Sequence, residues 1–156
     1  MNINVLDFEE ILKNFTPYHE SLKSIQKYKQ DFSDIIKDIK TEMESIANGS
    51  KSLILDNSTI QKSEIRFKEL QTKALQAESE FRATINIKQN EEIDLNFKQI
   101  NKIVDSYSVL NNIDLVINKN SVVYNTEKID ITLNIIEEIK KIGLYNEYKE
   151  NSYNLA

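Results

Sequence analysis

Hydrophobic residues recur at a seven-residue period from Tyr18 onward. The first series is Tyr18, Ile25, Phe32, Ile39 and Ile46, and the offset series is Leu22, Ile36 and Met43, with Lys29 out of place. Alternating steps of four and three over four heptads are the seam of a coiled coil. An ordinary amphipathic helix is the weaker alternative, because it rarely keeps so strict a repeat for so long. The pattern predicts a long helix that ends at Asn48-Gly49-Ser50, since glycine favours helix ends.

A second long helix is predicted from about Thr59 to Leu110, with Ser58 and Gln61 at the spacing of a capping box. Its apolar series is Ile60, Phe67, Leu70, Ala74, Ala77 and Phe81, and it resumes at Ile93, Phe97, Ile100, Val104 and Tyr107. Between Phe81 and Ile93 the spacing stretches to fours, with Thr84, Lys88 and Gln89 at or near the seam. We expect the weakest packing there. The two helices together form an antiparallel hairpin.

Short strands are predicted on both sides of this hairpin. Ile3 to Phe8 is a β-favouring run, followed by a helical first turn at Glu9 to Leu12, and Pro17 either kinks that helix or opens a new one. In "IDLVINKNSVVYN", residues 113–125, apolar and polar positions alternate with the period of a strand. An asparagine-rich turn then precedes Val122-Val123-Tyr124, so the stretch is predicted to be a β-hairpin, and three short strands can pair.

A last helix is predicted after Thr132, its expected N-cap, and Gly143 ends it. The fold class is therefore α+β but mainly α, with a long coiled-coil hairpin inserted in a small β-stranded head. Residues 1–17 and 111–143 form the head, residues 18–110 form the hairpin with its tip at about 48–58, and residues 144–156 form a polar tail. The sequence does not fix the conformation of that tail.

The composition supports few, long elements, because the 156 residues include only two glycines and one proline. The net charge of −5 gives no electrostatic footprint for nucleic acid, and membrane contact is not expected. The absence of cysteine excludes disulfides and thiol catalysis. The first residues have neither the basic nor the apolar region of a signal peptide, so we expect the chain as given to be cytoplasmic, and periplasmic if a leader has been removed.

No catalytic or cofactor-binding arrangement is found in the sequence. The single histidine, His19, is expected to be a surface residue, because it is a lone histidine without a paired carboxylate or a second ligand. The adjacent pairs Glu91-Glu92 and Glu137-Glu138 point in different directions on a helix and are expected to be solvated. We expect no enzyme activity, no cofactor and no metal.

The order of these elements resembles the Skp (OmpH-like) chaperone family, most strongly over "IDLVINKNSVVYNTEKIDITLNIIEEIKK" at residues 113–141. "INVLDFEEIL" is similar to the family's first strand and helix start. The resemblance implies a homotrimer whose β strands form a central body and whose helical hairpins project around a cavity for unfolded clients. The residues expected to trimerise are Val5, Leu6, Phe8, Ile113, Leu115, Ile117, Val122 and Tyr124. Those expected to bind clients are Leu53, Ile54, Leu55, Ile85 and Ile87.

The implied function is that of an ATP-independent holdase chaperone for unfolded or assembling client proteins. The alternatives are a structural or scaffolding coiled-coil protein and a dedicated phage-type assembly chaperone with a single partner. The charge departs from the strongly basic members of the family: residues 18–110 contain 14 basic and 15 acidic residues, close to neutrality. The basic hairpin surface expected to meet acidic lipid is therefore absent.

Overall fold

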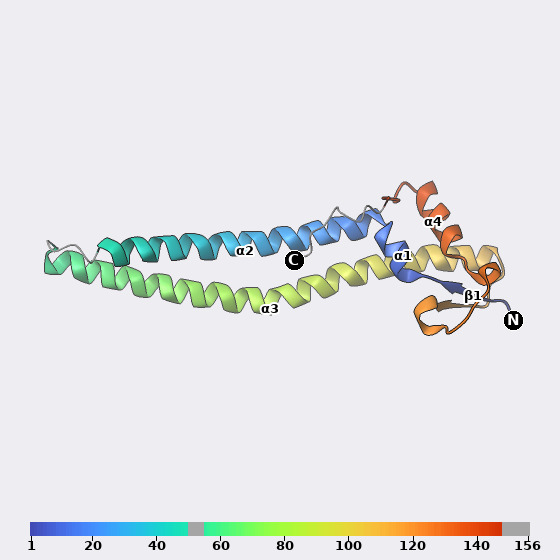
Figure 1. Cartoon of the computed structure of the whole chain (residues 1–156), viewed down its shortest axis with the longest axis horizontal. Coiled ribbons are helices and arrows are strands. Elements are labelled where there is room, and N and C mark those ends of the chain that lie inside the picture. Colours follow the sequence, from blue (N-terminus) through green and yellow to red (C-terminus); the bar gives the residue numbers. More distant parts are fainter. Residues whose placement is uncertain (50–54, 148–156) are drawn as a thin grey trace. The chain divides into compact units, whose positions relative to one another are not determined.

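The computed structural model describes residues 1–49 and 55–147. The chain divides into two compact units, and each is described by itself. We call Met1–Lys23 with Asn90–Ala156 the head unit, and Ser24–Gln89 the arm unit. The predictions for Leu53 and Ile54, and for residues 148–156 of the tail, lie outside the described residues. The elements are β1 (Ile3–Leu6), α1 (Phe8–Lys13), α2 (Thr16–Gly49), α3 (Asn57–Leu110), β2 (Leu115–Asn118) and α4 (Thr132–Lys141), with short 3-10 helices η1 (Lys119–Ser121) and η2 (Glu127–Ile129) before α4 (Figure 1).

The ends of the two long helices agree with the sequence prediction to within two residues. Pro17 is the second residue of α2 and opens this helix, where its missing N–H costs little. At the start of α3 the Asp56 carboxylate accepts from the Thr59 N–H at 2.7 Å, so Asp56 is the cap in place of Ser58. Asn112 ends α3 in the left-handed region, with φ 52°. The N–H of Ile113 then bonds the Ser108 carbonyl at 2.9 Å, which satisfies an otherwise unpaired carbonyl of the last turn.

The head unit contains a two-stranded parallel sheet, not the predicted three strands. Ile3 is opposite Leu115, and Leu6 is opposite Asn118. The predicted β-hairpin is wrong, because η1 follows β2 directly and Val122–Tyr124 forms no strand. The chain bends at Asn118, whose side chain accepts from the Asn120 N–H at 3.4 Å. The other edge of β1 is covered instead by a bridge to Asp130, where the Ile131 N–H bonds the Val5 carbonyl at 2.9 Å.

The core of the head unit lies between β1, α1, the last turns of α3, and α4. Figure 1 shows α4 against the end of α3, and the core is made of Leu6, Ile11, Phe15, Ile100, Val104, Ile131, Ile135, Ile136 and Ile139. The first residues of the tail belong to this unit. The Thr16 N–H bonds the Leu144 carbonyl at 2.8 Å, and the Asn146 N–H bonds the Asn14 carbonyl at 2.9 Å. The chain after α4 is thereby held against the start of α2.

The apolar seam of the arm unit agrees with the predicted repeat. Along α2 its members are buried or half-buried: Ile25, Tyr28, Phe32, Ile36, Ile39, Met43 and Ile46. Lys29 is exposed, and Tyr28 replaces it in the seam. The ring of Phe81 from α3 stacks on Phe32 at 4.1 Å and on Tyr28 at 5.6 Å between centroids. Thr84 is exposed, whereas Lys88 and Gln89 are half-buried, so polar side chains enter the seam at the end of this unit.

The predicted seam of α3 is wrong at two positions in the head unit. Ile93 is 37% exposed and Phe97 is 41% exposed, while Asn96 between them is only 2% exposed. The Asn96 amide donates to the Ser21 hydroxyl at 3.0 Å, and that hydroxyl donates to the Glu92 carboxylate at 2.8 Å. Phe97 instead stacks on Phe8 of α1, with 4.4 Å between ring centroids. A polar layer therefore occupies the place where apolar residues were expected.

Candidate binding surfaces

The side chains considered for chemistry in the sequence form no catalytic arrangement. His19 is buried, not exposed as predicted, and its Nε2 atom contacts the Lys13 carbonyl. Glu92 is half-buried against Ser21, so the prediction of a solvated side chain is wrong for it. In the second pair Glu137 is exposed, as predicted, whereas Glu138 is half-buried. Each accepts from a lysine one turn later, Glu137 from Lys140 at 3.0 Å and Glu138 from Lys141 at 2.8 Å. Within residues 1–49 and 55–147, no three His, Cys, Asp or Glu side chains are grouped as a metal site would require.

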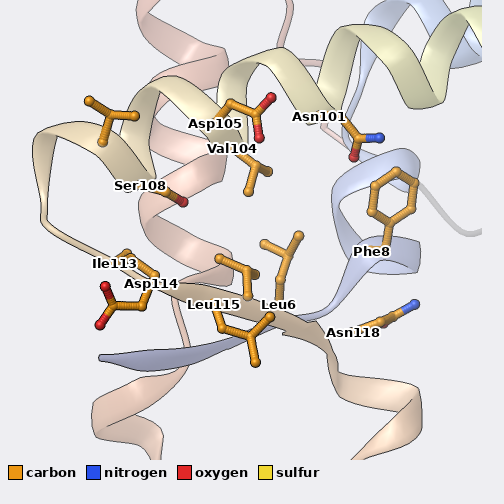
Figure 2. Close-up of a pocket in the computed structure, with 12 residues that line it drawn as sticks. Leu6, Phe8, Asn101, Val104, Asp105, Ser108, Ile113, Asp114, Leu115 and Asn118 are labelled. Carbon is orange, nitrogen blue, oxygen red and sulfur yellow. The ribbon is translucent and has the colours of Figure 1, made fainter. Parts of the chain in front are cut away.

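A cleft of about 530 Å³ opens in the head unit between α3 and the strands (Figure 2). Its apolar surface includes Leu6, Phe8, Val104, Ile113, Leu115 and Val116, and Asn101, Asp105 and Ser108 line it from α3. Figure 2 shows the Ser108 hydroxyl pointing from α3 toward the strands. This hydroxyl is buried and has no hydrogen-bond partner among the described residues. The cleft therefore combines an apolar floor with an unsatisfied polar group on one wall.

The residues predicted to trimerise divide into buried and exposed members. Val5 and Leu6 are buried within the head unit, and Phe8 is half-buried under Phe97. Ile113 and Leu115 line the cleft, and Leu115 is 46% exposed. Ile117 and Val122 are half-buried, whereas Tyr124 is 80% exposed. The two strands thus contain four of the eight residues, and only part of the set is accessible.

The residues predicted to bind clients also differ in their exposure to solvent. In the described part of the set, Leu55 and Ile85 are half-buried, and Ile87 is 59% exposed. Sequence reasoning missed Ile35, Ile65 and Leu75, which are largely exposed apolar side chains of the arm unit. Their positions outside the seven-residue series were the available signal. The arm unit also has a hollow of about 530 Å³ that is partly lined by Ile46, Ile60 and Phe67.

An ion pair of the head unit joins the Lys119 ammonium to the Asp130 carboxylate at 2.8 Å. Burial raises the pKa of the Asp130 carboxyl, but hydrogen bonds from Lys119 and from Thr132 outweigh it, so the net pKa lies below the usual value. The same contact raises the pKa of the Lys119 ammonium. Asp130 also accepts from the Thr132 N–H at 3.0 Å. The prediction of Thr132 as the N-cap is wrong, because Thr132 is the first residue of α4 and Ile131 occupies the cap position.

Comparisons with known proteins identify the family of the chain. The family model described as Outer membrane protein (OmpH-like) matches residues 2–139, and the curated proteins contain no match. That family is a chaperone family associated with the periplasm, and it is not a family of enzymes. In the described residues, no helix is long and apolar enough to cross a bilayer. Because the matched region contains both strands, both long helices and most of α4, the chain belongs to the OmpH-like family.

Proposed function

We propose that the protein is an ATP-independent holdase chaperone that works as a homotrimer and binds unfolded or assembling proteins on its helical arms. Membership of a chaperone family supports the general class. The observation that carries the specific proposal is the exposed apolar surface of the arm unit, where Ile65, Leu75 and Ile87 lie outside the packed seam. Scattered apolar contacts suit a binder of many unfolded chains, because they demand no particular fold or sequence of the client.

A trimer assembled through the head is the second part of the proposal. Within the described residues the sheet has two short strands, which is too few for independent stability without other packing. Leu115 and Tyr124 remain exposed beside it, and association would remove this apolar surface from water. Replacing Leu115 by Asp should dissociate the trimer, because it buries a charge without a partner. Asn120→Asp, an exposed site in the same segment, is the matched control. Sedimentation of the unaltered chain as a compact monomer would rule out this part of the proposal.

Suppression of aggregation tests the holdase activity directly. Several unrelated denatured proteins are diluted into buffer with the unaltered chain or with the Ile65→Ser, Leu75→Ser, Ile87→Ser variant. We expect the variant to protect all clients less well at an unchanged melting temperature, because the substituted side chains are exposed. Lys62→Ser with Glu78→Ser, on the same helix, is the control for exposed substitutions. Equal protection by both variants would show that these apolar residues do not contact clients.

A protein with a single partner is the alternative, as a scaffold or as a dedicated assembly chaperone. The acidic net charge of −5 favours it, because the sequence lacks the basic arm surface suited to acidic lipid. Protection of one client and none of the others would favour this alternative over a general holdase. The family is typically periplasmic, and we propose the same compartment for this chain, to be tested by fractionation of cells that express the complete gene.

A further inference from the structure

We infer that residues 144–146 are a clasp that opens separately from the core of the head unit, and that its opening releases the junction of α1 and α2. The clasp lies beyond residue 139, where the match to the family model ends. The inference goes beyond the proposed function, because it depends neither on an oligomer nor on client binding.

A glycine turns the chain back at the end of α4 and so places the clasp. Gly143 has φ 75°, in the left-handed region that glycine adopts at helix ends, and the Leu144 N–H then bonds the Ile139 carbonyl at 3.1 Å. The chain next runs antiparallel to the junction, with Tyr145 opposite Phe15. Figure 1 shows this segment passing from α4 to the start of α2.

The closed clasp bonds backbone groups at the ends of two helices. The first N–H groups of a helix have no carbonyl within the helix to bond. At the start of α2, Pro17 has no N–H, and the Thr16 N–H donates to the Leu144 carbonyl at 2.8 Å. At the end of α1, the Asn14 carbonyl accepts from the Asn146 N–H at 2.9 Å. The junction therefore depends on the clasp for both of these hydrogen bonds.

The clasp is held more weakly than the core on which it packs. Leu144 and Tyr145 contact that core but are only half-buried, whereas Phe15, opposite Tyr145, is fully buried. The exposed Lys140 ammonium lies 4.7 Å from the centroid of the Tyr145 ring, a contact that contributes little at an exposed site. Contacts that remain partly in water cost less to break. Local opening of this segment therefore needs less free energy than unfolding of the head unit.

Opening of the clasp frees the first turn of α2. The Thr16 N–H and the Asn14 carbonyl then bond water, and Phe15 loses the segment opposite it. Because linkage between two events is reciprocal, a partner that binds the released segment also loosens the first turn of α2. The competing interpretation is a tail that is a permanent part of the core and opens only when the head unit unfolds.

Amide exchange resolved by residue tests the clasp in the unaltered chain. One opening breaks both hydrogen bonds, so the Thr16 and Asn146 amides should have the same protection factor. We expect this factor to be at least about tenfold lower than that of the Ile131 amide, which bonds the carbonyl of the buried Val5 at 2.9 Å. Equal protection of Thr16 and Ile131 would show that the tail opens only with the core, and would overturn the inference.

A proline substitution tests the clasp in a second way. Asn146→Pro removes the N–H that bonds the Asn14 carbonyl and leaves the apolar side chains of the clasp unchanged. Exchange of the Thr16 amide should become about tenfold faster, as the loss of one hydrogen bond implies, while exchange of the Ile131 amide stays the same. Glu147→Pro, at the exposed position after the clasp, is the control and should change neither rate. An Asn146→Pro chain with an unaltered rate at Thr16, with an equal increase at Ile131, or without a folded state would contradict a separately opening clasp.

Discussion

The hydroxyl of Thr132 joins β1 to α4, and we predict that removing it destabilises the head unit more than removing its methyl group. Thr132 is buried at the first position of α4. Its hydroxyl accepts from the Asp7 N–H at 2.9 Å and donates to the Asp130 carboxylate. Asp7 in turn caps α1 by accepting from the Glu10 N–H at 3.1 Å. One side chain therefore links the end of β1 to the starts of two helices.

The substitution Thr132→Val keeps the shape of the side chain and removes both hydrogen bonds. A neutral hydrogen bond contributes about 1 kcal/mol and one to a charged group about 1.5–3 kcal/mol, so the loss is about 2.5–4 kcal/mol. Thr132→Ser keeps the hydroxyl and loses one buried methyl group, at about 0.8 kcal/mol. We therefore expect the free energy of unfolding of Thr132→Val to be lower than that of Thr132→Ser by about 2–3 kcal/mol.

Thermal unfolding followed by circular dichroism measures this difference at one fixed protein concentration, because association would make the melting temperature depend on concentration. A difference of this size lowers the melting temperature by about 5–10 °C in a chain of this length. Amide exchange should also become faster in α1 of the Val variant, since its cap depends on Asp7. Equal melting temperatures for the Val and Ser variants would show that the hydroxyl does not hold β1 and α4 together.

Three further predictions concern other parts of the chain. The low pKa of Asp130 stabilises the folded state above the unfolded carboxyl value of about 3.9, and this contribution is lost as the pH falls through the lower folded value. Asp130→Asn should therefore cost stability at pH 6 and little at pH 2, as urea unfolding at the two pH values will show. Phe81→Ala should lower the stability of the arm unit by about 2 kcal/mol, because the ring is half-buried and stacks on two aromatic partners. Amide exchange along the arm unit measures this loss of stability. Amide exchange should be faster over residues 84–92 than over 98–107, and Lys88→Leu should slow the exchange over 84–92. Uniform protection along α3 would contradict a weakly packed seam in this region.

The lengths and ends of the long helices followed from local patterns, because a seven-residue repeat reports which side of a helix is buried. The strands did not follow in the same way. Alternation at Ile113–Ile117 predicts an extended chain, but it does not say which strand pairs with it. The partner proved to be β1, more than a hundred residues earlier, and Asp130 covers the other edge of β1. The expected strand at Val122–Tyr124 has no neighbour to pair with in the described chain.

The exposure of Ile65 and Leu75 could have been predicted from the sequence, because both occupy positions that the seven-residue series leaves to solvent. The cleft beside β2 could not have been predicted in this way. It depends on how far α3 lies from the strands, and that distance is set by packing of Leu6, Val104 and Val116 in three separate elements. A periodic pattern describes one element at a time and contains no information about the space between elements.

Hydrogen bonds act together with the apolar repeat on the rotation of α3 in the head unit, where the repeat residues Ile100 and Val104 are buried. Ile93 and Phe97 fit the repeat, yet the structure buries Asn96, whose amide bonds Ser21 and also the Glu92 carbonyl at 2.8 Å. A buried amide is tolerated only when its hydrogen bonds are made, so this layer permits few alternative arrangements of α3 against α2. It also turns Phe97 outward to stack on Phe8. Three polar groups thus support the rotation of α3 in which Val104 and Ser108 line the cleft beside β2.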